Sequence, residues 1–174
     1  RIRPHVIAAL GLKLKLEYAS RYELASFCGR VVTHEATVAD PVWTMLKLAW
    51  FSSKYLGAKD STLAALLKAK AMSFLEQYNG CPVIAILAHS IVQQLSNIDH
   101  RTAAKFFDEY HAVPQSVPDL IEPGDSERAL CEKMFGFSIV DQLQVEDSVK
   151  GWKLGEDLVL PISVPPGYVQ NAYL

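Results

Sequence analysis

Residues 27–33 read Phe27-Cys28-Gly29-Arg30-Val31-Val32-Thr33, and Ala39-Asp40-Pro41 follows shortly after them. The first stretch is largely apolar and contains two valines, which favours a short strand. In the second stretch, Asp40 can cap a helix and Pro41 fits a first helical turn. Together they predict the boundary between a small β-sheet and a helical bundle, which is an α+β fold.

The chain before this boundary carries strand and helix signals. Residues 12–17 alternate strictly between leucine and a charged residue, so a strand there places its leucines on one face. Residues 24–32 resume strand character, and we expect the two segments to pair as an antiparallel hairpin. Residues 4–10 resemble the end of a helix that Gly11 closes. Residues 33–38 are predicted to be a connector.

Helical periodicity dominates after the boundary. We expect the first helix to begin at Asp40 and to end near Gly57, because its apolar residues recur with a period of 3.6. A second helix is expected to begin after Asp60 or Ser61. Gly80 suits the left-handed position that closes it.

The rest of the bundle is interrupted once. Residues 82–95 are apolar almost all round, which predicts a central helix, and a further helix is expected after Asp99. Residues 113–124 contain three prolines and a glycine and therefore predict an extended linker.

Two more helices are predicted after the linker. Asp125 or Ser126 is expected to cap a helix at residues 127–135, which the following glycine stops. Ser138 and Asp141 have the spacing of a capping box and predict the start of the next helix. From residue 151 onward, the prolines and the apolar run predict an extended tail that packs on the rest of the chain.

Composition narrows the class of protein. The chain has 174 residues, of which 50% are hydrophobic and 21% are charged, so one globular domain with a real core is expected. The net charge of −2 gives no sign of general polyanion binding, although a local basic face stays open. The longest apolar run, residues 81–88, is far shorter than the roughly 20 residues that a membrane span needs. No signal peptide is visible.

Several chemistries lack their motif. The sequence contains no GxSxG, no GxxxxGK[ST], no GxGxxG and no CxxC. The three cysteines are far apart and are expected to be reduced, buried small residues. Paired acids stand at loops or helix ends, where capping and solvation explain them: Asp119, Glu122, Asp125, Glu127, Glu146 and Asp147.

Two groups of side chains have two interpretations each. Lys13 and Lys15 project from one face of a predicted strand, where they are either solvated or in contact with phosphate oxygens. Four aromatic residues follow the boundary, and their helical spacing favours a core over a base-stacking platform: Trp43, Trp50, Phe51 and Tyr55.

Two ordered groups of residues resemble one known family. The first comprises Leu10-Gly11-Leu12-Lys13-Leu14-Lys15-Leu16-Glu17, Phe27-Cys28-Gly29-Arg30-Val31-Val32, Ala39-Asp40-Pro41 and Lys47-Leu48. The second comprises Glu127-Arg128-Ala129, Phe135-Gly136-Phe137-Ser138, Gln142 and Glu146. They resemble palm motifs D and E, the start of the thumb and the C-terminal pattern of RNA-dependent RNA polymerases from positive-strand RNA viruses, nodavirus-like or tombusvirus-like. Both groups follow the family's order.

The resemblance implies roles for individual residues. A motif D lysine is the family's proton donor to pyrophosphate, for which Lys15, Lys13 and Arg21 are the candidates, with Lys15 slightly favoured. The motif E turn at Cys28-Gly29 permits close approach to the nascent 3′ end, and Arg30 is expected to meet a phosphate. The thumb implies further RNA contacts from lysines on the predicted helices: Lys47, Lys54, Lys68 and Lys70.

The chain also departs from that family. No Gly-Asp-Asp occurs, and Gly124-Asp125 is followed by Ser126 in the predicted linker. We therefore expect Mg²⁺ or Mn²⁺ to be held by aspartates upstream in a full-length enzyme, and we expect none to be bound here. Because the first residue is Arg1, the chain is expected to be a piece of a longer protein or a processed product. Without the metal-binding aspartates, it is expected to be inactive alone.

The resemblance further implies a nucleotidyltransferase of viral RNA replication. Its partners are template and product RNA, nucleoside triphosphates, and the upstream fingers and palm. Its location is the host cytoplasm, in replication complexes that other regions attach to membranes, since no anchor is visible in these residues. The alternative is a stand-alone helical protein-interaction module without a role in nucleic-acid binding.

The resemblance divides the chain into four parts. Residues 1–38 are expected to be the palm edge, and residues 39–112 the first thumb helices. Residues 113–150 are expected to hold the proline-rich linker and two further thumb helices, and residues 151–174 the extended tail. This tail either packs back on the thumb or reaches toward the template channel, and its apolar residues favour packing over free disorder.

Overall fold

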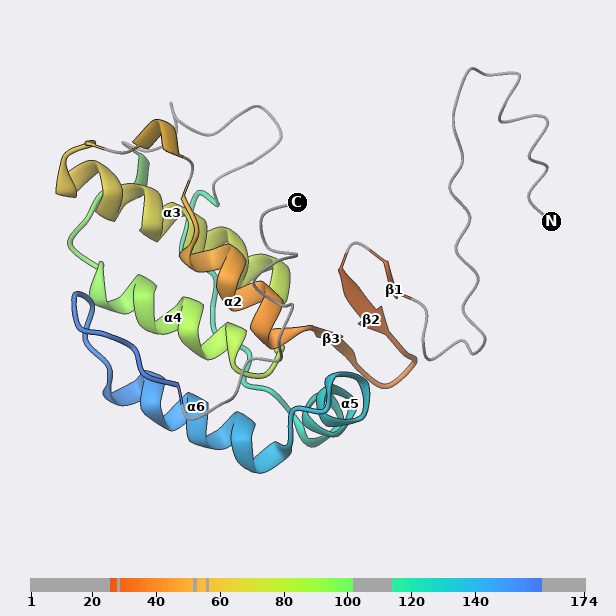
Figure 1. The fold of residues 1–174 in the computed structure, drawn as a ribbon. Helices are drawn as coiled ribbons and strands as arrows, with labels where there is room; N and C mark the ends of the chain where they lie inside the picture. Colours follow the sequence, from red (N-terminus) through yellow and green to blue (C-terminus); the bar gives the residue numbers. More distant parts are fainter. Residues whose placement is uncertain (1–25, 28, 52, 56, 102–113, 161–174) are drawn as a thin grey trace, which may run out of the picture.

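The computed structural model describes residues 26–27, 29–51, 53–55, 57–101 and 114–160. These residues form a mainly helical α+β fold with a small antiparallel sheet at one end of a helical bundle (Figure 1). The expected helix at 4–10, the strand at 12–17 and most of the helix after Asp99 lie outside the described residues. No described helix is both long enough and apolar enough to span a membrane.

The sheet contains three strands in chain order: β1 (Ser26–Phe27), β2 (Arg30–Val32) and β3 (Thr37–Ala39). Both neighbouring pairs are antiparallel. The single strand predicted at residues 24–32 is wrong, because a turn between Phe27 and Arg30 divides it into β1 and β2. The third strand corrects the prediction of a connector at residues 33–38. The reason is a tight turn, in which the Thr33 hydroxyl accepts a hydrogen bond from the Ala36 amide at 3.0 Å and returns the chain to the sheet.

The first helix, α2 (Pro41–Ala49), begins as predicted, because Asp40 Oδ1 accepts a hydrogen bond from the Trp43 amide at 3.1 Å. Its predicted end near Gly57 is wrong. Trp50 is extended, and a short 3₁₀-helix, η2 (Ser53–Tyr55), follows.

Tertiary packing explains this early end. Phe51 and Tyr55 lie against the buried residues Ala65, Leu66 and Ala69 of the next helix. Burial of these two rings against α3 therefore stabilises the chain more than further turns of α2 would. Local periodicity does not reveal this contact.

The helices α3 (Asp60–Tyr78) and α4 (Ile84–Gln94) confirm the second and third predictions. Helix α4 lies between α3 and α6 (Ile139–Gly151), as Figure 1 shows. Residues 81–88 are all buried, so the helix that is apolar almost all round is indeed central.

Helix α5 (Asp125–Phe135) ends at Gly136, whose φ of +67° suits glycine. Its N-cap is Gly124, so the expected capping by Asp125 or Ser126 is wrong. In contrast, the predicted helix start at Ser138 is confirmed, because Ser138 Oγ accepts a hydrogen bond from the Asp141 amide at 3.1 Å. The same hydroxyl donates to the Asp141 carboxylate at 2.6 Å.

The segments around these helices also follow the predictions. Residues 114–124 contain no helix or strand. In the tail, Trp152, Leu158 and Leu160 pack against the main core. The side chain of Gln94 accepts a hydrogen bond from the Leu154 amide at 2.6 Å. The described part of the tail is therefore attached to the bundle. It is not extended throughout, because the Glu156 amide donates a hydrogen bond to the Lys153 carbonyl and closes a tight turn.

Two cysteines lie within the described residues. Cys81 and Cys131 are both free and buried, as predicted. Burial raises the pKa of the Cys131 thiol to about 12, which keeps it protonated at neutral pH. Cys28 lies outside the described residues.

Candidate nucleic-acid interface

The structure describes only some of the residues that the resemblance singled out. Lys13, Lys15 and Arg21, the three candidate proton donors, lie outside the described residues, as does Cys28. The side chain of Lys54 is also outside the described part. Their predicted roles stay predictions. The described candidates for RNA contact are Gly29, Arg30, Lys47, Lys68 and Lys70.

Gly29 and Arg30 stand at the hairpin turn. Phe27 pairs with Arg30, so only positions 28 and 29 join the two strands. Gly29 has a φ of +75°, a conformation that L side chains rarely adopt. The guanidinium carbon of Arg30 lies 5.0 Å from the centre of the Tyr78 ring, at the C-terminal end of α3. The turn therefore places one cation beside the helical bundle.

Lys70 provides a second cation on α3. Its Nζ lies 5.1 Å from the centre of the Phe51 ring and 5.9 Å from that of Phe74, and it donates a hydrogen bond to the Trp50 carbonyl. Burial lowers the pKa of Lys70 to about 8. The ammonium group is therefore partly removed from water and surrounded by aromatic rings.

Aromatic rings connect the two cations. The ring centres of Phe74 and Tyr78 lie 5.3 Å apart with an interplanar angle of 53°. Five side chains from three segments consequently form one continuous series of contacts, which we call the cation–aromatic row: Arg30, Tyr78, Phe74, Lys70 and Phe51.

Helix α2 carries a third such contact. The exposed Lys47 has its Nζ 5.2 Å from the centre of the Trp43 ring. Trp50 is 57% exposed, so its expected place in the core is wrong. Phe51 and Tyr55 are half-buried and pack against α3. Of the aromatic residues expected in the core, Phe51 and Tyr55 therefore pack against α3, whereas Trp50 is exposed.

Lys68 does not belong to this surface. It is 5% exposed, and its Nζ donates hydrogen bonds to the carbonyls of Ser96 at 3.1 Å and Ile98 at 2.7 Å. The predicted RNA contact is therefore corrected to a structural tie between α3 and the segment after α4. A signal was present, because Lys68 shares helical spacing with the buried residues Ala65 and Met72.

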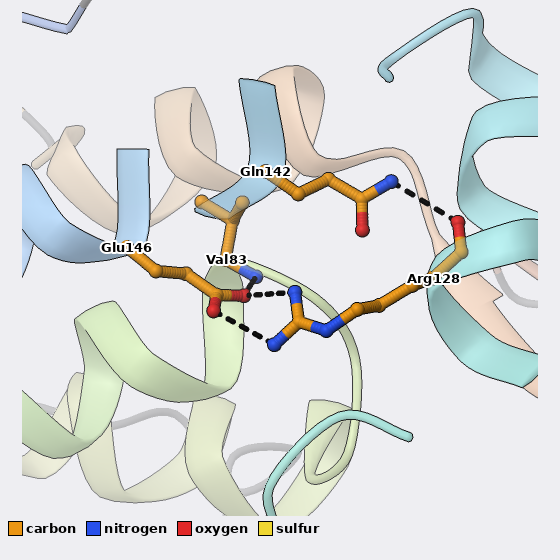
Figure 2. A network of polar contacts seen from close by, with 4 residues as sticks. All are labelled: Val83, Arg128, Gln142 and Glu146. Atoms are coloured by element: carbon orange, nitrogen blue, oxygen red, sulfur yellow. Dashed lines mark hydrogen bonds and ion pairs between the residues drawn. The ribbon is translucent and has the colours of Figure 1, made fainter. Parts of the chain in front are cut away.

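A second polar site lies inside the bundle (Figure 2). Arg128 of α5 makes two hydrogen bonds to Glu146 of α6, at 3.0 and 2.8 Å. Glu146 is 3% exposed, and it also accepts a hydrogen bond from the Val83 amide at 2.9 Å. The earlier explanation of Glu146 by solvation at a helix end is wrong, whereas Asp147 is exposed as expected.

Gln142 extends this network. Its Nε2 donates hydrogen bonds to the carbonyls of Arg128 at 3.1 Å and Phe137 at 2.7 Å. Its Oε1 accepts none from the described residues. Val83 has a φ of +68°, which is costly for a β-branched residue, and the bond to Glu146 helps to hold it there.

The network brings together residues that sequence reasoning grouped only by resemblance. Arg128, Gln142 and Glu146 come from the C-terminal pattern, and they join α5 and α6 to the start of α4. Gln142 and Glu146 are buried, the Arg128 side chain is only 12% exposed, and all three are joined by hydrogen bonds, as in a contact that holds helices together. We call this network the structural lock. The network is therefore separate from the surface cations of the row.

Two open hollows flank the turn at residues 33–36. One, of about 350 Å³, is bounded by this turn and by α5, including Ser126 and Lys133. The other, of about 460 Å³, reaches Asn79 and Glu127. Within the described ranges, no three metal-ligating side chains gather at these hollows or elsewhere.

Comparison with known proteins yields no match. No family model, no curated protein and no solved structure matches this chain. A functional assignment therefore depends on the residues themselves, on their geometry and on the sequence resemblance.

Proposed function

We propose that this chain is the palm edge and thumb of an RNA-directed RNA polymerase from a positive-strand RNA virus of nodavirus-like or tombusvirus-like kind. In the full-length nucleotidyltransferase it grips template and product RNA while other regions carry the metal-binding aspartates. One observation carries the proposal: a tight glycine hairpin with a basic residue beside its turn belongs to a small sheet whose last strand leads directly into a helical bundle.

The hairpin supports this proposal through its shape and charge. Gly29 has no side chain, and an added Cβ would have no neighbour within 4 Å, so a strand of RNA can approach the backbone closely there. Arg30 offers several N–H donors, which suit phosphate oxygens. Such contacts hold the 3′ end of a growing strand without reading its sequence.

The order of elements gives independent support. The third strand ends at Ala39, and Asp40-Pro41 begins α2 immediately afterwards. The resemblance implies this order of a motif E hairpin followed by a thumb. The buried network of Arg128 and Glu146 supports a structural role for the C-terminal pattern, because it fixes α5 and α6 against α4.

In this proposal, the metal-dependent chemistry belongs to upstream regions of the enzyme, and this chain supports RNA. Mg²⁺ or Mn²⁺, held by upstream aspartates, supplies charge neutralisation to phosphoryl transfer when bound. The residues of this chain support RNA, through Arg30, Lys47 and Lys70 among the described ones. Lys15, Lys13 and Arg21 are the proposed donors of a proton to pyrophosphate. In the cell, the enzyme works in cytoplasmic replication complexes.

Reading the coding sequence upstream of Arg1 tests the proposal. A Gly-Asp-Asp motif a short distance before Arg1 is the expected result, because the metal-binding motif precedes motifs D and E in this family. A start codon at or just before Arg1, or an upstream region without the two aspartate motifs, contradicts the proposal.

A helical protein-interaction module is the second candidate. Val140 and Leu143, one turn apart on α6, are 63% and 49% exposed, which is typical of a protein-binding helix face. This module binds no RNA. Absence of RNA binding at every salt concentration therefore distinguishes it from the polymerase fragment.

A further inference from the structure

One face of α3 combines basic, aromatic and hydrogen-bonding side chains. Lys70, Phe74 and Tyr78 recur every four residues and therefore lie on one side of the helix. Ser73 and Gln77 fall beside them, and Gln77 Nε2 donates a hydrogen bond to Ser73 Oγ at 3.2 Å. Together these five positions define the α3 face.

Cations stand at both ends of this face. Lys70 is at one end, and Arg30 contacts Tyr78 at the other. Glu76 is two residues from both Phe74 and Tyr78, so it points about 160° away from each around the helix. The α3 face itself therefore carries no acid, although the net charge of the whole chain is −2.

The length of the face suits a short segment of a nucleic-acid strand. Residues 70 and 78 are separated by about 12 Å along the helix axis. A stacked strand carries one phosphate per about 3.4 Å of its axis, so a strand that runs along the face places about three to four nucleotides on it. Phe74 and Tyr78 are partly buried against the core. Basic residues at the two ends can meet phosphates, while the solvent-accessible parts of these two rings face bases.

We propose that the α3 face, together with the exposed Trp50, binds an unpaired segment of RNA by stacking on its bases. In a duplex, the base faces are occupied by neighbouring base pairs, so aromatic side chains reach only unpaired bases. The Arg30 guanidinium offers a further planar surface for stacking. Trp50 adjoins Lys70 through its carbonyl.

This inference rests on the proposed function and adds to it a single-stranded RNA path distinct from the hairpin turn. The hydrogen-bonding groups of Ser73 and Gln77 can contact base edges or sugar hydroxyls, whereas the rings accept any base. The face is therefore expected to bind unpaired RNA with little sequence preference.

Fluorescence anisotropy with the full 174-residue chain tests the inference. The probes are a labelled, unstructured oligoribonucleotide of about ten nucleotides and a blunt RNA duplex of the same length. Phe74→Leu removes a ring and keeps an apolar side chain. Phe135→Leu is the matched control, because Phe135 is also partly buried against the main core but lies on α5.

The expected result is that Phe74→Leu weakens binding of the single strand by at least about 5-fold and leaves duplex binding unchanged, the lower limit for loss of one stacked base. Trp50→Ala, at an exposed position, gives the same result if Phe74→Leu fails to fold. Phe135→Leu has no effect on either probe.

Two results overturn the inference. If the chain binds both probes and neither ring variant weakens single-strand binding, the stacking site is absent while the proposed RNA grip stands. If the chain binds neither probe at any salt concentration, both the inference and the proposed function fail.

Discussion

At the scale of single residues, the lysines of α3 show that exposure decides the role of a charge. Lys68 and Lys70 are two positions apart, so they lie on opposite sides of the helix. Lys68 donates to two carbonyls inside the protein, whereas Lys70 lies among aromatic rings at the edge of the bundle. Of these two lysines, Lys70 alone remains a candidate for contact with RNA.

Replacement of Lys68 tests its structural role. Lys68→Met leaves the carbonyls of Ser96 and Ile98 without their donor, so we expect the free energy of unfolding to fall by about 1–3 kcal/mol. Urea denaturation measures the change, with the exposed Lys59→Met as a control that shifts stability by less than about 0.5 kcal/mol. Unchanged stability together with weaker RNA binding would restore the role predicted from the sequence.

The lowered pKa of Lys70 predicts a dependence of stability on pH. In the unfolded chain this lysine keeps its proton up to its ordinary pKa of 10.5, whereas the folded chain releases it from about pH 8. The unfolded state therefore binds more protons between these values, and the contribution of Lys70 to stability rises with pH in that window.

Urea midpoints of the wild type and Lys70→Met at pH 7.5 and pH 9 measure this contribution. We expect the difference between the two proteins to shift in favour of the wild type at the higher pH. The comparison with the variant removes the effects of other groups, including the buried Cys131, whose raised pKa acts in the opposite direction above the ordinary thiol value. An equal change in urea midpoint for both proteins between pH 7.5 and pH 9 contradicts the lowered pKa of Lys70.

At the scale of elements, the bundle depends on one ion pair between α5 and α6. Arg128 and Glu146 are held together by two hydrogen bonds, and the same carboxylate fixes the amide of Val83 before α4. Removal of one partner leaves a buried charge, which is far costlier than removal of both.

Arg128→Met is therefore expected to lower the free energy of unfolding by about 3–5 kcal/mol. The double variant Arg128→Met/Glu146→Gln recovers part of this loss, because no unpaired charge remains. Asp147→Asn, at the exposed neighbouring position, is the control. If Arg128→Met changes stability no more than Asp147→Asn does, the network is not a structural lock.

Local signals predicted most helix starts and ends, but contacts distant in sequence were needed for the rest. Asp40 and Ser138 cap their helices, and Gly136 ends one, because these effects act within a single turn. The early end of α2 depends on Phe51 packing against α3, and the strand β3 depends on its pairing with β2.

The candidate site shows the same division. Arg30 was singled out from its place beside Gly29, and the structure adds Tyr78 as its partner. No pattern in the sequence connects Arg30 with Lys70 or Phe74, because the row crosses three segments. The burial of Glu146 was missed for the same reason, since its partner lies on another helix.

At the scale of the whole molecule, the described residues form a sheet edge followed by a bundle with separate structural and surface cations (Figure 1). A near-neutral chain can bind RNA only through a local basic surface. The hairpin turn with Arg30 and the α3 face supply such a surface, and they stand on the same end of α3 at Tyr78. This arrangement makes retention of RNA the central claim.

The most direct measurement is the RNA affinity of the 174-residue chain across a salt series, for the wild type, Arg30→Ala and the exposed control Lys153→Ala. We expect the logarithm of the association constant to fall linearly with the logarithm of salt concentration. Loss of one phosphate contact in Arg30→Ala reduces that slope by about 0.7–0.9, and Lys153→Ala keeps the wild-type slope. An identical slope and affinity for Arg30→Ala, or no binding by the wild type at low salt, contradicts the account.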